Sequence, residues 1–600
     1  MNKLEILKKY FGHTEFRYGQ EEIIDCLLSK RDTLCVMPTG AGKSACYQIP
    51  ALMLDGITLV VSPLVSLMKD QVTSLTQAGI DAAYINSSLS TSQYYKVLEN
   101  AKKSKYKLIY IAPERLVTQD FIDICSVVNV SMVAVDEAHC VSHWGQDFRP
   151  TYLRIVEFIN KLAYRPVIGA FTATATKEVE EDISCILQLQ DPLTIVTGFD
   201  RKNLSFEVRK PKDKDAQLIN ILKEEKDNCG IIYCATRKNV ETVCETLCKA
   251  GFLATRYHAG LKDEERKQNQ EDFIFDKKQI IVATNAFGMG IDKSNVSFVI
   301  HYNMPKSMEG YYQEAGRAGR DGERARCIIL YSQADVRTNA YIIDNSEINT
   351  ELDLDMQEAV REKERERLKK ITYYCTTTDC LRAYILKYFG EITKDYCGNC
   401  SNCNTSFKIE DITINAQKIL SCIAKNNSRF GIKMIVDILR GSKNERLLRL
   451  KLDDQSTYGI MSDISEKKVR SILNFLLLEK YIATSNSEYP VLCVTSLAKN
   501  ILKNGEKLSM KALVTEEVKV SVDNKYISQD IDLNLLGKLK ELRKEIATKQ
   551  RVPAYIIFTD AALKDMCLKK PKTLVEFLDI AGVGKTKQEK YGEAFLAAIN

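Results

Sequence analysis

The chain has 600 residues, of which 45% are hydrophobic and 27% charged, a balance typical of globular proteins that excludes collagen-like and low-complexity chains. This length suggests roughly four domains, because one core rarely serves more than about 150 to 250 residues. The net charge of +6 permits local basic patches but does not by itself indicate a nucleic-acid partner.

The N-terminus and the cysteines indicate the compartment. The first residues, MNKLEILKKYFGH, carry charges throughout and lack the apolar core of a secretory leader. No apolar run approaches the ~20 residues needed to span a bilayer. The 19 cysteines are therefore expected to be reduced thiols with one metal site among them. We expect a cytoplasmic protein with no membrane partner.

A short motif near the start, FRYGQ, opens a predicted helix from Gln20 to Leu28. A glutamine amide can pair with both the ring nitrogen and the amino group of an adenine edge. Taken alone, the motif is as well explained by a simple helix-start turn. Its position just ahead of the next motif favours a nucleotide contact, and we assign Arg17 and Gln20 to an ATP site.

A predicted strand, Thr33 to Met37, leads into the glycine-rich loop PTGAGKS and then a helical pattern. Such a loop closes backbone N–H groups around phosphates, while Lys43 reaches the β- and γ-phosphates and the Ser44 hydroxyl takes Mg²⁺. The match is to a variant, since Met37 stands where the general motif has glycine. We predict an NTP site, and not a chance glycine-rich turn, at Thr39, Gly40, Ala41, Gly42, Lys43 and Ser44.

The stretch MVAVDEAHCVSHWGQDFRP, from Met132 to Pro150, joins an apolar run to two acids. The run suits a strand buried on both faces of a parallel sheet, and ligands gather at the carboxyl ends of such strands. Asp136 is expected to hold Mg²⁺ through water, and Glu137 to polarise the attacking water. Acidic pairs are common on solvated surfaces, but a pair that ends a wholly apolar strand is much rarer.

Further strands are predicted at 58–62, at 108–111 and before the TATAT motif of residues 172–176, with a domain boundary near residue 205. A second series follows at 230–234, 280–284, 296–301 and 327–331, without a second lysine-bearing phosphate loop. It carries Arg317 and Arg320 between glycines. These arginines either occupy a surface turn or reach across a cleft to transition-state charge, as arginine fingers do.

In this order and spacing, MPTGAGKS, DEAH, TATAT, FGMGID and YYQEAGRAGRDG resemble superfamily 2 helicases. WGQDFRP after DEAH resembles the aromatic-rich loop of the RecQ DNA helicases, and the similarity extends over essentially the whole chain. The resemblance implies that Gln20 reads adenine, that Gly290 and Asp292 belong to the ATP site, and that translocation runs 3′ to 5′. It also implies a DNA-coupling set of Trp144, Asp147, Phe148 and Arg149. His143 and Gln146 depart from the family, which more often has glutamine at the first of these positions and histidine at the second.

A cysteine set with C-x16-C-x2-C-x2-C spacing follows a charged run, 361–370, that predicts a solvated helix. All histidines of the chain lie elsewhere, so a metal here must be held by four thiolates, which suits structural Zn²⁺. Cys375 competes for the first place, but Cys380 follows Asp379, a predicted helix N-cap, and the resemblance also selects it. An iron–sulfur cluster is the rival, although the ferredoxin continuation is absent. The predicted ligands are Cys380, Cys397, Cys400 and Cys403.

Helical spacing at 416–424, 434–439 and 469–478, followed by a hairpin of 481–484 and 491–495, predicts a winged helix that docks duplex DNA. Tyr489 near the hairpin tip either stacks on a terminal base pair or packs beside Pro490, and we favour packing. Residues 506–530 are predicted to be a linker. Residues 533–600 are helical in pattern and resemble an HRDC domain, an auxiliary DNA-binding bundle, although its lysine cluster at 569–572 also suits a solvated face.

We therefore predict a multidomain α/β protein: two RecA-like parallel-sheet motor domains (1–205 and 206–340), a helical four-cysteine zinc-binding domain (341–405), a winged helix (406–515) and a linker with an HRDC-type bundle (516–600). The expected function is ATP-dependent, Mg²⁺-dependent 3′–5′ DNA unwinding in recombination and repair. The alternatives are an RNA helicase, a non-separating DNA translocase, or a DNA-binding scaffold with a vestigial ATPase. Expected partners of the monomer are single-stranded and duplex DNA with junctions or 3′ tails, and a single-stranded DNA-binding protein.

Overall fold

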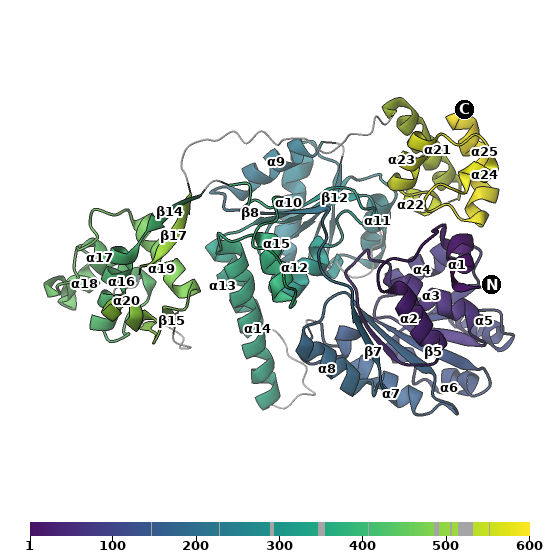
Figure 1. Cartoon of the computed structure of the whole chain (residues 1–600), viewed down its shortest axis with the longest axis horizontal. Helices are drawn as coiled ribbons and strands as arrows, with labels where there is room; N and C mark the ends of the chain where they lie inside the picture. Colours follow the sequence, from purple (N-terminus) through teal and green to yellow (C-terminus); the bar gives the residue numbers. More distant parts are fainter. Residues whose placement is uncertain are drawn as a thin grey trace. The chain divides into compact units, whose positions relative to one another are not determined.

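The structure is a computed structural model that describes residues 1–145, 147–226, 228–287, 293–345, 354–405, 407–484, 491–504, 507–513, 532–550 and 552–600 (Figure 1). Five residues named above, Gln146, Gly290, Asp292, Tyr489 and Pro490, lie outside the described residues. The chain divides into two compact units. The first unit is Met1–Asn402 with Asp523–Asn600, and the second is Cys403–Val522.

The first sheet has seven parallel strands in the order β3-β4-β2-β5-β6-β1-β7. They are β1 (Thr33–Val36), β2 (Ile57–Val61), β3 (Ala82–Ile85), β4 (Leu108–Ile111), β5 (Val130–Asp136), β6 (Val167–Thr172) and β7 (Leu193–Val196). Every residue of β1, β2, β4 and β6 is buried, as in parallel sheets covered on both faces. The strands predicted here are confirmed, with ends shifted by at most two residues.

Helices connect these strands, because consecutive parallel strands need a crossover. They are α3 (Lys43–Met53), α4 (Val65–Gln77), α5 (Thr91–Lys102), α6 (Gln119–Cys125), α7 (Arg154–Ile159) and α8 (Lys177–Ile186). The short α1 (Lys3–Ile6), η1 (Leu7–Phe11) and α2 (Gln20–Leu28) precede the first strand. Three tight helical turns, η2 (Pro113–Arg115), η3 (Ala138–Val141) and η4 (Pro150–Leu153), follow β4 and β5. Helix α2 begins and ends where the sequence predicts.

The second sheet has six parallel strands in the order β10-β11-β9-β12-β13-β8. They are β8 (Leu204–Arg209), β9 (Cys229–Tyr233), β10 (Ala254–Tyr257), β11 (Ile280–Ala283), β12 (Val296–His301) and β13 (Ala325–Leu330). Its helices are α9 (Lys214–Glu224), α10 (Arg237–Lys249), α11 (Asp263–Ile274) and α12 (Met308–Ala315), with the turn η5 (Asn285–Phe287). The predicted second parallel-sheet motor domain is confirmed. Residues 197–203, called the connecting segment below, join the two sheets.

Three helices follow the second sheet: α13 (Gln333–Asp344), the long α14 (Leu354–Thr376) and α15 (Leu381–Tyr388) (Figure 1). Helix α14 contains the charged run 361–370, but Leu368 is buried and the Arg367 side chain is only 12% exposed, so this helix is not solvated on all sides. The N-cap of α15 is Cys380, whose sulfur accepts from the backbone N–H of Ala383. The prediction of Asp379 as N-cap was wrong by one residue, because Asp379 instead forms a turn with Thr377.

The C-terminal part of the first unit is the predicted helical bundle. Its helices are α21 (Leu533–Gln550), α22 (Ala554–Ile557), α23 (Asp560–Lys569), α24 (Leu574–Phe577) and α25 (Lys585–Ile599). Phe558, Phe577 and Phe595 are fully buried, and edge-to-face contacts of Phe558 with the other two rings join the loops and helices into one core.

The second unit combines helices with two small antiparallel pairs of strands. Its elements are β14 (Phe407–Asp411), α16 (Thr413–Lys425), α17 (Ile432–Arg440), α18 (Glu445–Arg449), η6 (Leu452–Asp454), α19 (Glu466–Leu478), β15 (Ile482–Thr484), β16 (Leu492–Val494), α20 (Ala498–Asn504) and β17 (Ser509–Leu513). The predicted helices and the β15–β16 hairpin are present. The predicted linker at 506–530 was wrong over its first part: β17 pairs with β14, and Leu508 and Met510 are buried in the core.

Within the described residues, no helix has the length and apolarity that crossing a bilayer would require.

Candidate active site and metal centre

The predicted phosphate loop, residues 38–44, lies between the end of β1 and the start of α3. Gly40 and Gly42 have φ angles of 85° and 89°, a left-handed conformation that L side chains rarely adopt. Helix α3 begins at Lys43, so its free N–H groups and the lysine charge occur together at the loop. Such a helix start binds anions, and phosphate in particular.

Arg17 and Gln20 hold this loop from the N-terminal side. Arg17 Nη1 donates to the Gly40 carbonyl over 2.6 Å, and Gln20 Nε2 donates to the carbonyls of Ala41 and Gly42 over 3.3 and 3.1 Å. The Gln20 amide oxygen accepts from the Arg17 backbone N–H over 2.9 Å. In this structure the Gln20 amide therefore binds the phosphate loop, and its contact with adenine stays a prediction.

The two acids lie at the carboxyl end of β5, as expected. Asp136 is the last residue of the strand, and Glu137 follows it with a left-handed φ of 50°. Burial, followed by the charge of Glu137, raises the pKa of Asp136 to about 7. Burial also opposes ionisation of Glu137, but the positive groups around it, Lys43 first among them, outweigh burial and lower the Glu137 pKa. The arrangement favours the ionised form of Glu137, and a cation bound beside Asp136 would favour the ionised form of that residue as well.

A path of polar contacts leads from these acids to the second sheet. His139 Nδ1 lies 3.4 Å from a Glu137 carboxylate oxygen and 2.9 Å from the hydroxyl of Thr172, the last residue of β6. The Thr174 N–H donates to the Thr172 hydroxyl over 3.3 Å, and the Thr174 hydroxyl accepts from Gln313 of α12 over 3.1 Å. The TATAT motif thus contacts His139, which lies beside Glu137, and the helix before the arginine turn.

Arg317 and Arg320 lie in the turn after α12 and border the same cavity as the phosphate loop and the acids. This cavity measures about 770 Å³, and its walls include Lys43, Asp136, Glu137 and both arginines. The Arg317 side chain is buried, and its Nε has no hydrogen-bond partner among the described residues. A buried guanidinium with a free donor, facing a lysine and two acids, fits a nucleotide phosphate with its Mg²⁺. The structure therefore brings together the catalytic residues that the sequence predicts.

The aromatic loop that follows the acids is held by helix α14. Arg367 donates to the carbonyls of Trp144 and Gly145, and Lys363 Nζ lies 5.7 Å from the centre of the Trp144 ring. Sequence reasoning missed Arg367 because it lies in a run of alternating charges that looks fully solvated. Its only signal is its place one helical turn before Ile371, which is buried on the same face of α14.

The other predicted DNA-coupling residues make contacts within the same loop. Arg149 donates to Asp147 Oδ2 through Nε and Nη2, over 3.1 and 2.9 Å, and to the Pro63 carbonyl over 3.2 Å. The rings of His143 and Phe148 lie 4.0 Å apart at 35°. The loop is thereby folded on itself and joined to the loop after β2.

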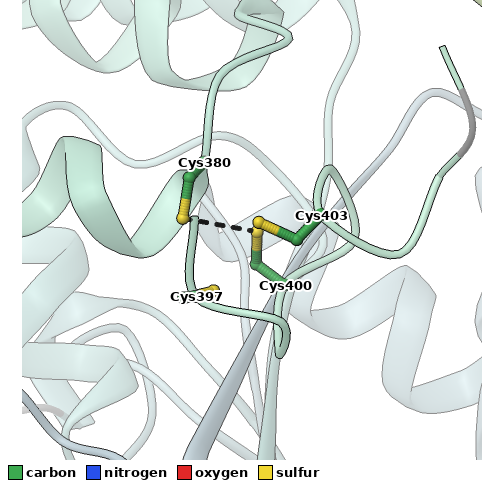
Figure 2. Close-up of side chains that lie close together, drawn as sticks. All are labelled: Cys380, Cys397, Cys400 and Cys403. Atoms are coloured by element: carbon green, nitrogen blue, oxygen red, sulfur yellow. Dashed lines mark hydrogen bonds between the residues drawn. The ribbon is translucent and has the colours of Figure 1, made fainter. Parts of the chain in front are cut away.

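The four predicted cysteine ligands form a cluster. All four sulfurs lie within 4.8 Å of one another, and the sulfurs of Cys380 and Cys400 are 3.9 Å apart (Figure 2). Zn–S bonds of about 2.3 Å in a tetrahedron require sulfur separations of about 3.8 Å, whereas a disulfide requires about 2.05 Å. Hydrogen bonds with neighbouring thiols lower the pKa of Cys397 and raise that of Cys380. The geometry fits Zn²⁺ held by four thiolates.

Cys375 does not belong to this cluster. It is buried in helix α14, and burial raises the pKa of its thiol. Its sulfur is not among the four that lie within 4.8 Å of one another, whereas that of Cys380 is. Of the two cysteines that compete from the sequence, the structure therefore selects Cys380.

Five family models match consecutive segments of the chain and together cover most of it. They are the DEAD/DEAH box helicase (residues 17–182), the helicase conserved C-terminal domain (213–322), the RecQ zinc-binding domain (333–404), the RQC domain (406–519) and the HRDC domain (532–599). The zinc-binding match covers the cysteine cluster, and the two helicase matches include the phosphate loop, both acids and both arginines.

Relatives with this whole arrangement are found among bacteria. The chain is 44% identical to the ATP-dependent DNA helicase RecQ of Bacillus subtilis over 99% of this chain and 98% of the relative. It is 39% identical to the helicase of the same name from Pasteurella multocida, over 99% and 93%, and 38% identical to that of Haemophilus influenzae, over 99% and 95%. Because the matches cover nearly the whole chain, including both sheets and the cysteine cluster, the chain belongs to the RecQ family of ATP-dependent DNA helicases.

Proposed function

We propose that this chain hydrolyses ATP in the cavity between its two sheets and uses the cycle to unwind duplex DNA with 3′ to 5′ polarity, in recombination and repair. The observation that carries the proposal is the shared cavity, which joins Lys43, Asp136 and Glu137 of the first sheet with Arg317 and Arg320 of the second. A nucleotide bound there contacts both sheets, so its hydrolysis changes how strongly they are held together.

In the proposed reaction, Lys43 and the start of α3 bind the β- and γ-phosphates, while Ser44 and Asp136 hold Mg²⁺. Glu137 orients the attacking water, and its lowered pKa keeps the carboxylate ionised for that role. Arg317 and Arg320 stabilise the charge that develops on the transferred phosphoryl group. The Thr39–Gly42 loop, Arg17, Gln20, Gly290 and Asp292 complete the proposed ATP site.

The proposed DNA contacts begin where the acids end. Trp144 and Phe148 offer aromatic faces on which single-stranded bases stack without sequence preference, and Arg149 offers charge to the backbone. The winged helix docks duplex DNA, and the C-terminal bundle adds an auxiliary contact. Zn²⁺ bound by Cys380, Cys397, Cys400 and Cys403 holds α15 beside the second sheet. A monomer acting at the nucleoid, with a single-stranded DNA-binding protein as partner, completes the proposal.

A fork-unwinding assay with wild type and Lys43→Ala tests this function. The matched control is Lys105→Ala, which removes an exposed lysine from the same domain. We expect wild type and the control to separate the strands in the presence of ATP and Mg²⁺, and Lys43→Ala to separate none. Equal unwinding by Lys43→Ala and wild type would overturn the proposed site. Hydrolysis without strand separation by wild type would favour a translocase, and unwinding confined to RNA duplexes an RNA helicase.

A further inference from the structure

Arg201, in the connecting segment, donates hydrogen bonds to both sides of the nucleotide cavity. Its Nη1 donates to the carbonyl of Thr39 over 2.5 Å and to that of Gly316 over 3.3 Å. Its Nη2 donates to the carbonyls of Ala318 and Gly319 over 3.1 and 2.8 Å. Thr39 belongs to the phosphate loop, whereas the other three carbonyls belong to the turn that carries the arginines. One planar guanidinium therefore spans the two functional segments.

The acceptors around this guanidinium are all neutral. The fifth donor, Nε, bonds to the Asn203 side-chain oxygen over 3.3 Å, and the described residues place no carboxylate in hydrogen-bond contact with Arg201. Burial, with the charges of Arg320 and Arg17 adding to it, lowers the Arg201 pKa. A buried guanidinium whose N–H groups donate mainly to backbone carbonyls fixes backbone positions and does not neutralise an acid.

The arginine turn is fixed tightly by this segment. Asn203 Nδ2 donates to the carbonyls of Gly319 and Glu323, both over 2.8 Å. A Cβ built on Gly40 of the phosphate loop would lie 3.3 Å from Arg201 Nη1 and 3.7 Å from Arg320 Cγ. Arg201 and Arg320 thus face the same glycine of the loop.

The connecting segment is in turn held by α15. Arg382 Nη1 donates to the Asp200 carboxylate over 2.5 Å and to the Arg201 carbonyl over 2.8 Å, and its Nη2 donates to the Leu204 carbonyl. Arg382 follows Cys380 by two residues, so the cysteine cluster anchors the helix from which it reaches. The backbone at Arg201 is therefore itself held in place by Arg382.

We propose that Arg201 is a positioning residue for ATP hydrolysis, whose guanidinium sets the separation between the phosphate loop and the turn that carries Arg317 and Arg320. This inference rests on the proposed function, in which those two arginines meet the transferred phosphoryl group. Arg201 acts through them, so its removal displaces their charge from the reaction and leaves ATP binding by the phosphate loop largely intact.

Lysine cannot replace Arg201 in this role. An ammonium group is a single compact charge with three donors, whereas the observed contacts use the five donors of a rigid planar fork. If Arg201 served only as positive charge beside the phosphates, Arg201→Lys would restore activity. The lysine variant therefore separates a positioning role from a general electrostatic one.

The test measures single-turnover phosphate release, with saturating single-stranded DNA, in Arg201→Lys, Arg317→Ala and the double variant. We expect Arg201→Lys to lower the rate by roughly 30-fold with ATP affinity changed by less than about threefold. When Arg317 is already alanine, Arg201→Lys should lower the rate by less than about a further threefold, because the effects of residues that act as one unit are not additive. Lys202→Ala, at the exposed neighbouring position, should retain the wild-type rate.

A wild-type rate in Arg201→Lys, or a full loss of roughly 30-fold repeated in the Arg317→Ala background, would overturn the positioning role. A wild-type rate in Arg317→Ala would instead overturn the proposed function of that arginine, and the positioning role with it. Asn203→Ala is a second test of the same role, which remains informative if Arg201→Lys does not fold. It removes the two bonds to Gly319 and Glu323, and a smaller rate loss that disappears in the Arg317→Ala background is expected. Melting temperatures of all variants are compared with wild type.

Discussion

Gln313 Nε2 donates a hydrogen bond to the Thr174 hydroxyl over 3.1 Å, joining helix α12 of the second sheet to the loop after β6 of the first. Thr174 is also bonded to Thr172, which contacts His139 beside the acids. Changes at the nucleotide can therefore reach the second sheet through a short series of hydrogen bonds. We expect this contact to help transmit ATP hydrolysis to motion of the second sheet.

Thr174→Val removes the hydroxyl that accepts from Gln313 and keeps the side-chain shape. A neutral hydrogen bond contributes about 0.5 to 1.5 kcal/mol, so we expect strand separation per ATP to fall roughly 3- to 10-fold while ATP still binds. Thr174→Ser keeps the hydroxyl and should restore coupling. Measuring base pairs opened and phosphate released in one reaction checks the ratio, and equal ratios for the valine and serine variants would argue against this path.

Trp144→Ala tests the coupling of DNA to hydrolysis. Trp144 lies beyond the acids in the sequence and is not among the described residues that line the nucleotide cavity, so basal ATPase should stay within about twofold of wild type. Stimulation by single-stranded DNA should disappear, because the ring is the proposed stacking platform. Tyr164→Ala, which removes an exposed ring from the same domain, is the control and should be stimulated normally. Normal stimulation of Trp144→Ala would place the coupling elsewhere.

Cys397→Ser tests the metal site through a half-buried ligand. Removing one of four thiolates should abolish tight zinc binding and lower the melting temperature, because the binding energy of a structural zinc contributes directly to folding. Metal analysis should find about one zinc per chain in wild type and little in the variant. Cys375→Ser, which lies outside the cluster, should keep its zinc. Iron with sulfide in the wild-type protein would contradict the four-thiolate zinc assignment.

Local patterns were sufficient to predict most of the fold and the centre of the site. Apolar runs such as Leu108 to Ile111 are fully buried strands, and the polar loops that follow strands of a parallel sheet necessarily gather at one edge. The phosphate loop, the two acids and the arginine turn could therefore be assigned to one cavity before their distances were available. The cysteine spacing was equally informative, because its last three cysteines are close together in the sequence and their spacing is typical of metal ligands.

Contacts between distant parts of the chain were beyond this reasoning. Arg201 was visible only as one charge in a segment that breaks the strand pattern, and its acceptors are backbone carbonyls, which carry no sequence signal. Arg367 was hidden in the same way by a run of alternating charges. The error at 509–513 has a related cause: β17 is a short strand in a polar region, and its pairing with β14 depends on a partner about 100 residues away.

We infer that ATP hydrolysis between the two sheets drives strand separation. Glu137→Gln tests it most directly, because the amide keeps the shape of the side chain but cannot polarise water as a carboxylate does. ATP affinity, phosphate release and unwinding of one forked DNA are measured together. We predict affinity within about threefold of wild type, phosphate release lowered by roughly 1,000-fold, and no unwinding. Unwinding by Glu137→Gln at the wild-type rate would show that hydrolysis promoted by Glu137 does not drive strand separation.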